Sequence, residues 1–125
     1  MDDKFKKQLE ENGADVDTTL KRFMGNDGIF MKFILKFLDD KNYAGLLENL
    51  EQKDYQAAFN SAHTLKGVTA NLGLDPIRDV VSEMTELLRN HQEIDDAKVH
   101  ELDGLKQQLI EKYDIFYKII EENRP

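Results

Sequence analysis

Apolar residues recur along most of this chain at steps of three and four, the spacing of amphipathic α-helices packed on a core. The pattern is clearest in residues 55–72, where it forms a stripe of Tyr55, Ala58, Ala62, Leu65, Thr69 and Leu72. No segment alternates with the period of a β-strand, and no repeat with a period of about 20–50 residues is present. The pattern therefore predicts an all-α fold.

The N-terminal third predicts several shorter helices. Residues 2–11 form a weak helix, residues 15–24 a second short one, and residues 27–38 a third whose phenylalanines we assign to the core. The polar residues 39–42 then interrupt the pattern, which resumes at Tyr43 with a different phase. We expect a kink or two abutting helices at this point.

Caps and breakers define the remaining helices. Asp54 caps the helix that follows it, and Gly73 is well placed to end that helix in the left-handed conformation. Asp75 and Pro76 then restart a helix, with Asp75 as N-cap and Pro76 at the first position. A last helix runs over residues 95–122. These elements predict an up-down antiparallel four-helix bundle with one or two additional short N-terminal helices that cover one end.

One histidine stands apart from the core pattern. At roughly 100° per residue, His63 lies about 130° from the centre of the apolar stripe, so we expect it at the surface. Lys66 and Gly67 are its helical neighbours. A glycine inside a helix costs about 1 kcal/mol relative to alanine, which indicates that space is needed beside His63. A nucleophilic nitrogen, an adjacent cation and an open approach together favour phosphoryl transfer to histidine.

The segment His63-Thr64-Leu65-Lys66-Gly67, followed by Gly73, is similar to the His-x-Leu-Lys-Gly-x-x-x-x-x-Gly signature of histidine-containing phosphotransfer (HPt) domains. It matches at every signature position. Phe23 to Asp27 before a phenylalanine-rich helix, and Asp54-Tyr55 at the start of the histidine helix, also resemble the family, so the resemblance covers roughly residues 14–120. Members carry phosphoryl groups between receiver domains in two-component phosphorelays.

The resemblance implies a phosphocarrier and not an enzyme. His63 would accept a phosphoryl group from a receiver-domain aspartate or a hybrid kinase and pass it to a response regulator. In the family, Nε2 takes the group while Nδ1 is held from the neighbouring helix, often by Glu or Gln. Thr85, on an expected polar flank of helix 76–91, aligns there; a surface threonine without a role is the alternative. Lys66 resembles the lysine that offsets phosphate charge, and Gly67 would leave steric access.

A receiver domain also needs an apolar docking surface around the transferred group, since complexes use aromatic anchors. Phe59 lies one turn before His63, and we expect it to be partly exposed; the alternative is packing against the second helix. The expected docking residues are Phe59, Asn60, Thr64, Ala70, Phe23 and Met24. The implied partners are receiver domains and a sensor or hybrid kinase. The receiver would supply the aspartate and the Mg²⁺, and no cofactor or metal is expected on this chain.

Composition narrows the class of protein. A chain of 125 residues with 40% hydrophobic content suits one domain spanning residues 1–125. The net charge of −8 argues against a nucleic-acid partner, which requires a basic face. No run approaches the roughly 20 apolar residues of a membrane span. The N-terminal segment is acidic and lacks the apolar region of a signal peptide. The absence of cysteine fits a reducing compartment. We expect a cytoplasmic monomer with no membrane partner.

Three other functions were weighed. A metal-carboxylate bundle needs Glu-x-x-His pairs, but the residues three before the histidines are Asn60, Leu88 and Ala97. A histidine kinase dimerisation domain would need a nucleotide-binding domain or a dimer seam, and the chain has no glycine-rich phosphate loop. A helical adaptor with a vestigial histidine stays open. His91 and His100 have no patterned neighbours and are interpreted as solvated residues.

Overall fold

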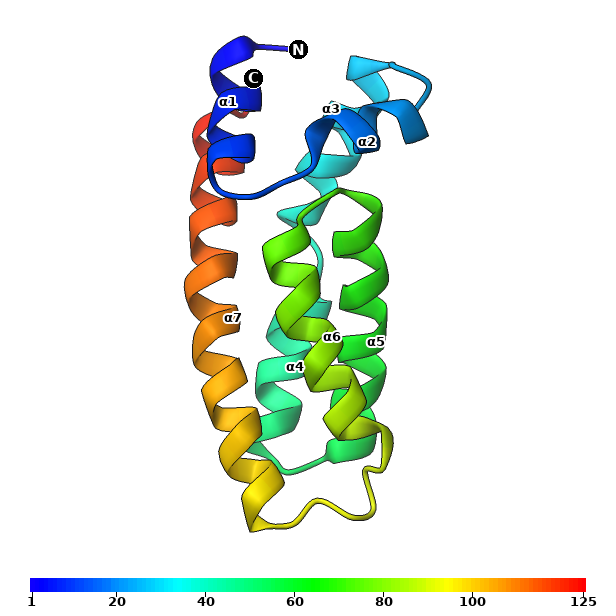
Figure 1. Ribbon diagram of the computed structural model, residues 1–125, viewed down its shortest axis with the longest axis vertical. Helices are drawn as coiled ribbons and strands as arrows, with labels where there is room; N and C mark the ends of the chain where they lie inside the picture. The colour runs from blue at the N-terminus through cyan, green and yellow to red at the C-terminus, as the bar shows by residue number, and fades with distance from the viewer.

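The computed structural model describes all 125 residues and consists of helices joined by short turns (Figure 1). The elements are α1 (Asp3–Glu11), α2 (Val16–Arg22), α3 (Asp27–Phe37), α4 (Asn42–Glu51), α5 (Tyr55–Asn71), α6 (Asp75–Arg89) and α7 (Asp96–Glu122). None of the seven helices is at once long and apolar enough to cross a bilayer.

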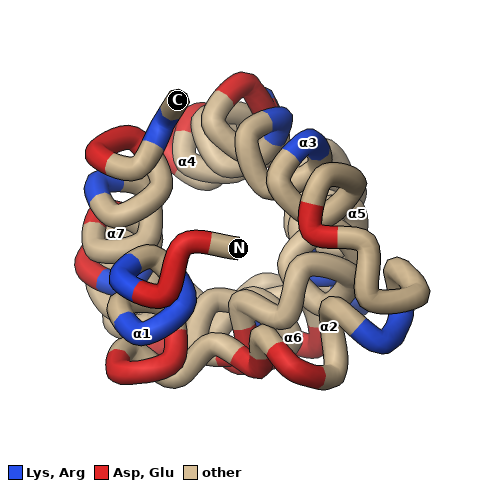
Figure 2. Tube along the Cα trace, turned by 90° about the horizontal axis from the view of Figure 1, so that it is seen from above, with Lys and Arg blue, Asp and Glu red and all other residues tan.

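The helices α4, α5, α6 and α7 form the predicted up-down bundle, and α7 runs along its full height (Figure 1). The short helices α1 and α2 lie at one end, and the N-terminus reaches over that end of the ring of helices (Figure 2). The fold class expected from the sequence is confirmed. The predicted interruption at residues 39–42 is also present, because α3 ends at Phe37 and α4 begins at Asn42, whose backbone N–H donates to the Asp40 carboxylate at 2.8 Å.

Buried apolar side chains from every helix form one continuous cluster. On α5 the buried positions are Ala58, Ala62, Leu65 and Thr69, which are the centre of the predicted stripe. Two alanines on this face let α5 lie close to its neighbours. Phe30 and Phe37 are buried as expected, whereas Phe33 is 39% exposed and stacks on Phe23 with ring centroids 5.4 Å apart.

The turn between α5 and α6 is a Schellman motif built on Gly73. Its φ of +71° is the left-handed conformation that glycine tolerates, and the Leu74 N–H donates to the Thr69 carbonyl at 2.9 Å. The Gly73 carbonyl in turn accepts from the Asp15 N–H at 2.8 Å. A Cβ on Gly73 would lie 2.5 Å from the Asp15 carbonyl oxygen and closer still to the Thr19 hydroxyl oxygen. Gly73 therefore joins three helices where no side chain fits.

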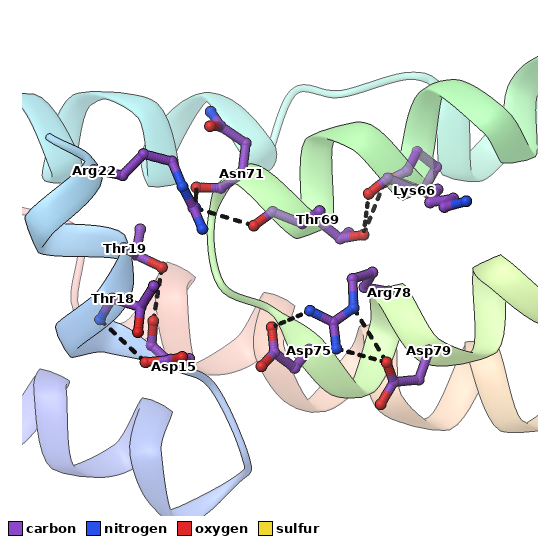
Figure 3. Close-up of polar contacts among 12 residues, drawn as sticks. Asp15, Thr18, Thr19, Arg22, Lys66, Thr69, Asn71, Asp75, Arg78 and Asp79 are labelled. Carbon is purple, nitrogen blue, oxygen red and sulfur yellow. Dashed lines mark hydrogen bonds and ion pairs between the residues drawn. The ribbon is translucent and has the colours of Figure 1, made fainter.

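The predicted N-cap of α6 was wrong by one residue. Leu74 is the N-cap and Asp75 is already helical, because the Leu74 carbonyl accepts from the Arg78 N–H at 3.0 Å. The residue that completes the Schellman motif thus also starts the next helix. Asp75 lies inside the first turn of α6, where its carboxylate accepts from the Arg78 guanidinium at 3.0 Å (Figure 3).

Arg22 closes the same end of α5 from α2. Its Nη1 donates to the carbonyl oxygens of Ala70 at 3.1 Å and Asn71 at 2.6 Å (Figure 3). The last carbonyls of a helix have no partner within the helix and carry partial negative charge, so a guanidinium there is favourable. The N-terminal helices therefore help to hold the C-terminal end of α5.

The Gly73 junction predicts a large difference between two glycine substitutions. Gly73→Ala combines left-handed strain with a clash against Asp15 and Thr19, so it should lower the free energy of unfolding by ~2–4 kcal/mol. Gly104→Ala, in the interior of α7 where a Cβ meets no atom within 4 Å, should raise it by up to ~1 kcal/mol. Urea unfolding followed by circular dichroism measures both. Equal changes in the unfolding free energy of the two variants would show that Gly73 is not required by close packing against Asp15 and Thr19.

Candidate functional site

His63 projects from α5 into solvent, on the side away from the buried stripe. Its imidazole stacks on the half-buried Phe59 ring one turn earlier, with centroids 5.9 Å apart and planes at 12°. Residues four apart share a helix face, so this stack follows from their spacing. The aromatic ring supports one face of the imidazole while the residue as a whole stays accessible.

Two cations and one carboxylate surround this stack. The Arg89 guanidinium of α6 lies over the Phe59 ring, 5.5 Å from its centroid, and donates to the Glu86 carboxylate at 2.9 Å. The hydrogen bond from Arg89, and the positive charges of Arg89 and Lys66, hold the pKa of the Glu86 carboxyl below its usual range. Glu86 is therefore ion-paired with Arg89 of α6, and the positive charge of Lys66 on α5 acts on the same carboxylate from a greater distance. Incoming phosphoryl oxygens would be alternative partners for both.

Gly67 is exposed on α5, and a Cβ built on it would meet no atom within 4 Å. Neither helix packing nor backbone conformation requires a glycine there, unlike at Gly73. The only consequence of this glycine within the molecule is an open surface one turn beyond His63. This geometry is what the proposed steric role needs.

The polar flank expected for Thr85 was wrong. Thr85 is fully buried, and its hydroxyl donates to the Val81 carbonyl at 2.7 Å instead of to His63. The residue falls one helical turn beyond Val81, on the face of α6 that is packed in the core. Because its hydroxyl is satisfied within the helix, burial costs little. Thr85 makes no hydrogen bond with His63 in this structure.

Arg89, one turn beyond Thr85, is a candidate that the sequence analysis did not identify. It is the residue of α6 that reaches the His63–Phe59 stack. Its spacing of three from Glu86 predicts their ion pair. The contact across helices to Phe59 could not be read from spacing within one helix.

The expected docking residues fall into two groups. Phe59, Asn60, Thr64 and Ala70 lie on α5, with Asn60 and Thr64 exposed and the other two half-buried. Phe23 and Met24 lie at the turn after α2, where Met24 is 95% exposed and Phe23 packs against Phe30 and Phe33. Phe59 packs under Arg89 and beside His63. Exposed apolar surface is thus present near the C-terminal end of α5 as well as beside the histidine.

The other histidines lie away from this arrangement. His100 is exposed on α7, as expected, whereas His91 is half-buried in the turn after α6, with its Nδ1 buried and without a hydrogen-bond partner. The interpretation of His91 as a solvated residue was therefore wrong for this ring nitrogen, which is shielded from solvent. No three His, Cys, Asp or Glu side chains are grouped so that they could hold a metal ion.

Comparison with known proteins gives one match. The family model of the Hpt domain matches residues 39–112, which is more than half of the chain. The chain belongs to the Hpt domain family. Hpt domains are phosphocarriers that work with receiver domains and kinases in two-component signalling. No curated protein and no solved structure matched the chain. The match contains α4, α5, α6 and the part of α7 up to residue 112, and with them His63 and its neighbours.

The open surface at Gly67 predicts that stability and transfer separate in this Hpt domain. Gly67→Ala should gain up to ~1 kcal/mol of stability and stay partly active. Gly67→Gln should be at least as stable as wild type yet strongly impaired, because its side chain occupies the surface that a receiver must approach. Phosphorylation by a receiver and by phosphoramidate should be compared, since the small donor needs less clearance. Normal transfer from a receiver to Gly67→Gln would refute the steric role, and unfolding would assign the glycine to packing.

The two cations predict a kinetic effect. Lys66→Ala and Arg89→Gln should each slow phosphorylation of the protein, or shorten the lifetime of phosphohistidine, by roughly tenfold or more, because each removes a positive charge near the transferred group. Stopped-flow transfer assays and decay of radiolabel measure the two quantities. Lys118→Ala, an exposed lysine on α7, is the matched control and should change neither. Unchanged rates and lifetimes in Lys66→Ala and Arg89→Gln would show that neither residue takes part in the transfer.

Proposed function

We propose that His63 is the phosphoacceptor of this Hpt domain. It would accept a phosphoryl group from a receiver-domain aspartate or a hybrid kinase and pass it to a response regulator. The observation that carries the proposal is the exposure of His63 at the signature position, with Phe59 on one side and open space at Gly67 on the other. His91 has neither a lysine nor a glycine within four residues, and His100 has Gly104 four residues later but no lysine three or four residues away.

The transfer forms one bond and breaks one. The lone pair of His63 Nε2 attacks the phosphorus of an aspartyl phosphate, and the bond from phosphorus to the carboxyl oxygen breaks as the N–P bond forms. The aspartate leaves as a carboxylate, and the imidazole carries positive charge until it loses the Nδ1 proton. A neutral imidazole, with a free lone pair on Nε2, is required as the nucleophile.

Lys66 and Arg89 provide the electrostatic part of the mechanism. Charge develops on the equatorial phosphoryl oxygens, and preorganised cations stabilise it without reorganisation at the moment of reaction. We infer that Arg89 exchanges part of its pairing with Glu86 for the phosphoryl group. The partner receiver would hold the Mg²⁺ and the aspartate, so this chain would need no cofactor and no nucleotide site. It would act as a single domain and as a monomer.

The docking surface would extend from Phe59, Asn60 and Thr64 along α5 towards Ala70 and the turn at Phe23 and Met24. The exposed Met24 side chain supports this extent, since it stands free of the core near the end of α5 that Arg22 holds. Apolar side chains surrounded by polar ones are the usual composition of a transient docking site.

The proposal predicts that labelling depends on one residue. His63→Gln should keep the helical content and melting temperature of wild type while losing all transfer from a phosphorylated receiver, because His63 is exposed and makes no core contact. The label on wild type should be acid-labile and alkali-stable, as a phosphoramidate is. His100→Gln, also exposed, is the matched control and should label normally. Label that persists on His63→Gln would overturn the assignment, and a wild type that never labels would favour a helical adaptor.

A further inference from the structure

An open groove of about 780 Å³ runs between α6 and α7, and of its lining residues only Glu86, through its ion pair with Arg89, belongs to the candidate site. Its apolar floor is made by Leu87 of α6 and Leu105 of α7, both of which are half-buried against the core. Its polar rim includes Glu83 and Glu86 from α6 and Glu101 from α7. The groove is therefore an apolar channel with acidic edges.

Gly104 deepens the groove from the α7 side. It lies in the interior of a 27-residue helix, where a glycine costs about 1 kcal/mol relative to alanine. A Cβ there would meet no atom within 4 Å, so no packing within the chain requires the glycine. The same argument applies to Gly67 beside His63. In both places the absent side chain leaves surface open to something outside the molecule.

The charges on the rim of the groove indicate which kind of partner it would bind. Three glutamates and no lysine or arginine line the groove. Glu86 is engaged by Arg89, but Glu83 and Glu101 form no ion pair in the molecule. They line the groove from two different helices. A partner with an apolar ridge between two rows of cations would satisfy both features at once.

We propose that the α6–α7 groove binds a short basic amphipathic helix from a partner protein. The groove lining on α7 spans residues 100–108, which is about 12 Å and equals two to three helical turns. One or two apolar side chains at helical spacing would lie on Leu87, Gly104 and Leu105, and flanking Lys or Arg would pair with Glu83 and Glu101. This is the helix-in-groove mode of recognition.

Other occupants fit less well. A small ligand is normally enclosed over most of its surface, and this groove is open along its length. Anionic lipid and nucleic acid would be repelled by the acidic rim. A second copy of this chain carries a net charge of −8, which opposes its approach to an acidic face. The proposal is independent of the phosphoacceptor assignment, because none of the residues proposed to contact the helix is used in transfer.

The test uses the full chain and a synthetic peptide of about 14 residues, with leucine at one helical stripe and lysine elsewhere. Its matched control has glutamate in place of every lysine. Fluorescence polarisation gives the Kd, and amide chemical shifts of the ¹⁵N-labelled protein locate the bound peptide. We expect binding of the lysine peptide alone, with shifts confined to α6 and α7 near Glu83, Leu87, Glu101 and Gly104, and with the same Kd for the His63→Gln protein.

Three variants make the result specific to the groove. Gly104→Gln fills it and should weaken the Kd by about tenfold or more, while circular dichroism shows unchanged helix because the added atoms meet open space. Glu83→Gln with Glu101→Gln should weaken it by roughly three- to tenfold. Glu10→Gln with Glu111→Gln removes the same charge from exposed positions outside the groove and should leave the Kd unchanged. Glu86 is left intact because it holds Arg89.

Several outcomes would overturn the proposal. Equal binding of the two peptides, equal weakening by the two pairs of glutamine substitutions, or shifts centred on α5 would each show that the groove is not the site. Sedimentation of the free protein as a dimer that Gly104→Gln dissociates would assign the groove to a second copy instead.

Discussion

The rotational setting of α5 in the bundle is the constraint on which the site depends. Ala58, Ala62, Leu65 and Thr69 are fully buried, and this fixes which side of the helix faces solvent. His63 and Gly67 then point outward, and the His63 ring stacks on Phe59 one turn earlier on the same helix. Two small residues in the stripe bring the neighbouring helices close, so a rotation of α5 would produce both a cavity and a clash. The direction in which the histidine points is therefore set by the buried stripe of α5, and Phe59 then supports one face of its ring.

The end of α5 is secured by helices outside the family match. The matched region begins at residue 39, yet Gly73 within it is held against Asp15 and Thr19, and Arg22 binds the last carbonyls of α5 (Figure 3). The glycine that ends the signature is thus a packing residue, in contrast to Gly67, which contacts nothing. One motif contains two glycines with opposite physical reasons. Gly67 leaves the surface beside His63 open, whereas Gly73 leaves room for Asp15 and Thr19 of the chain's own N-terminal region.

Charge is distributed unevenly around the histidine, although the chain is acidic as a whole. Lys66 and Arg89 come from different helices; Arg89 is ion-paired with Glu86, and the positive charge of Lys66 also helps to lower the pKa of that carboxyl. Both partners of the Arg89–Glu86 pair are exposed, so in the proposed transfer a phosphoryl group would compete with the carboxylate for the same donor. On the rim of the α6–α7 groove, Glu83 and Glu101 form no ion pair. The two partners proposed for α6 therefore differ in charge: an anionic phosphoryl group beside Arg89 and a basic helix in the groove.

The helices, the break at residues 39–42 and the exposure of His63 could be predicted from the sequence, because each depends on local spacing, caps and glycines. The signature around His63 likewise identified the family before any geometry was known. Only the tertiary structure decided that Thr85 is buried, that Arg89 reaches Phe59, and that Gly73 meets Asp15. These depend on how α6 is rotated against α5 and where α2 lies over the bundle end. That rotation is set by packing among residues far apart in the chain, and a helical period within one segment contains no information about it.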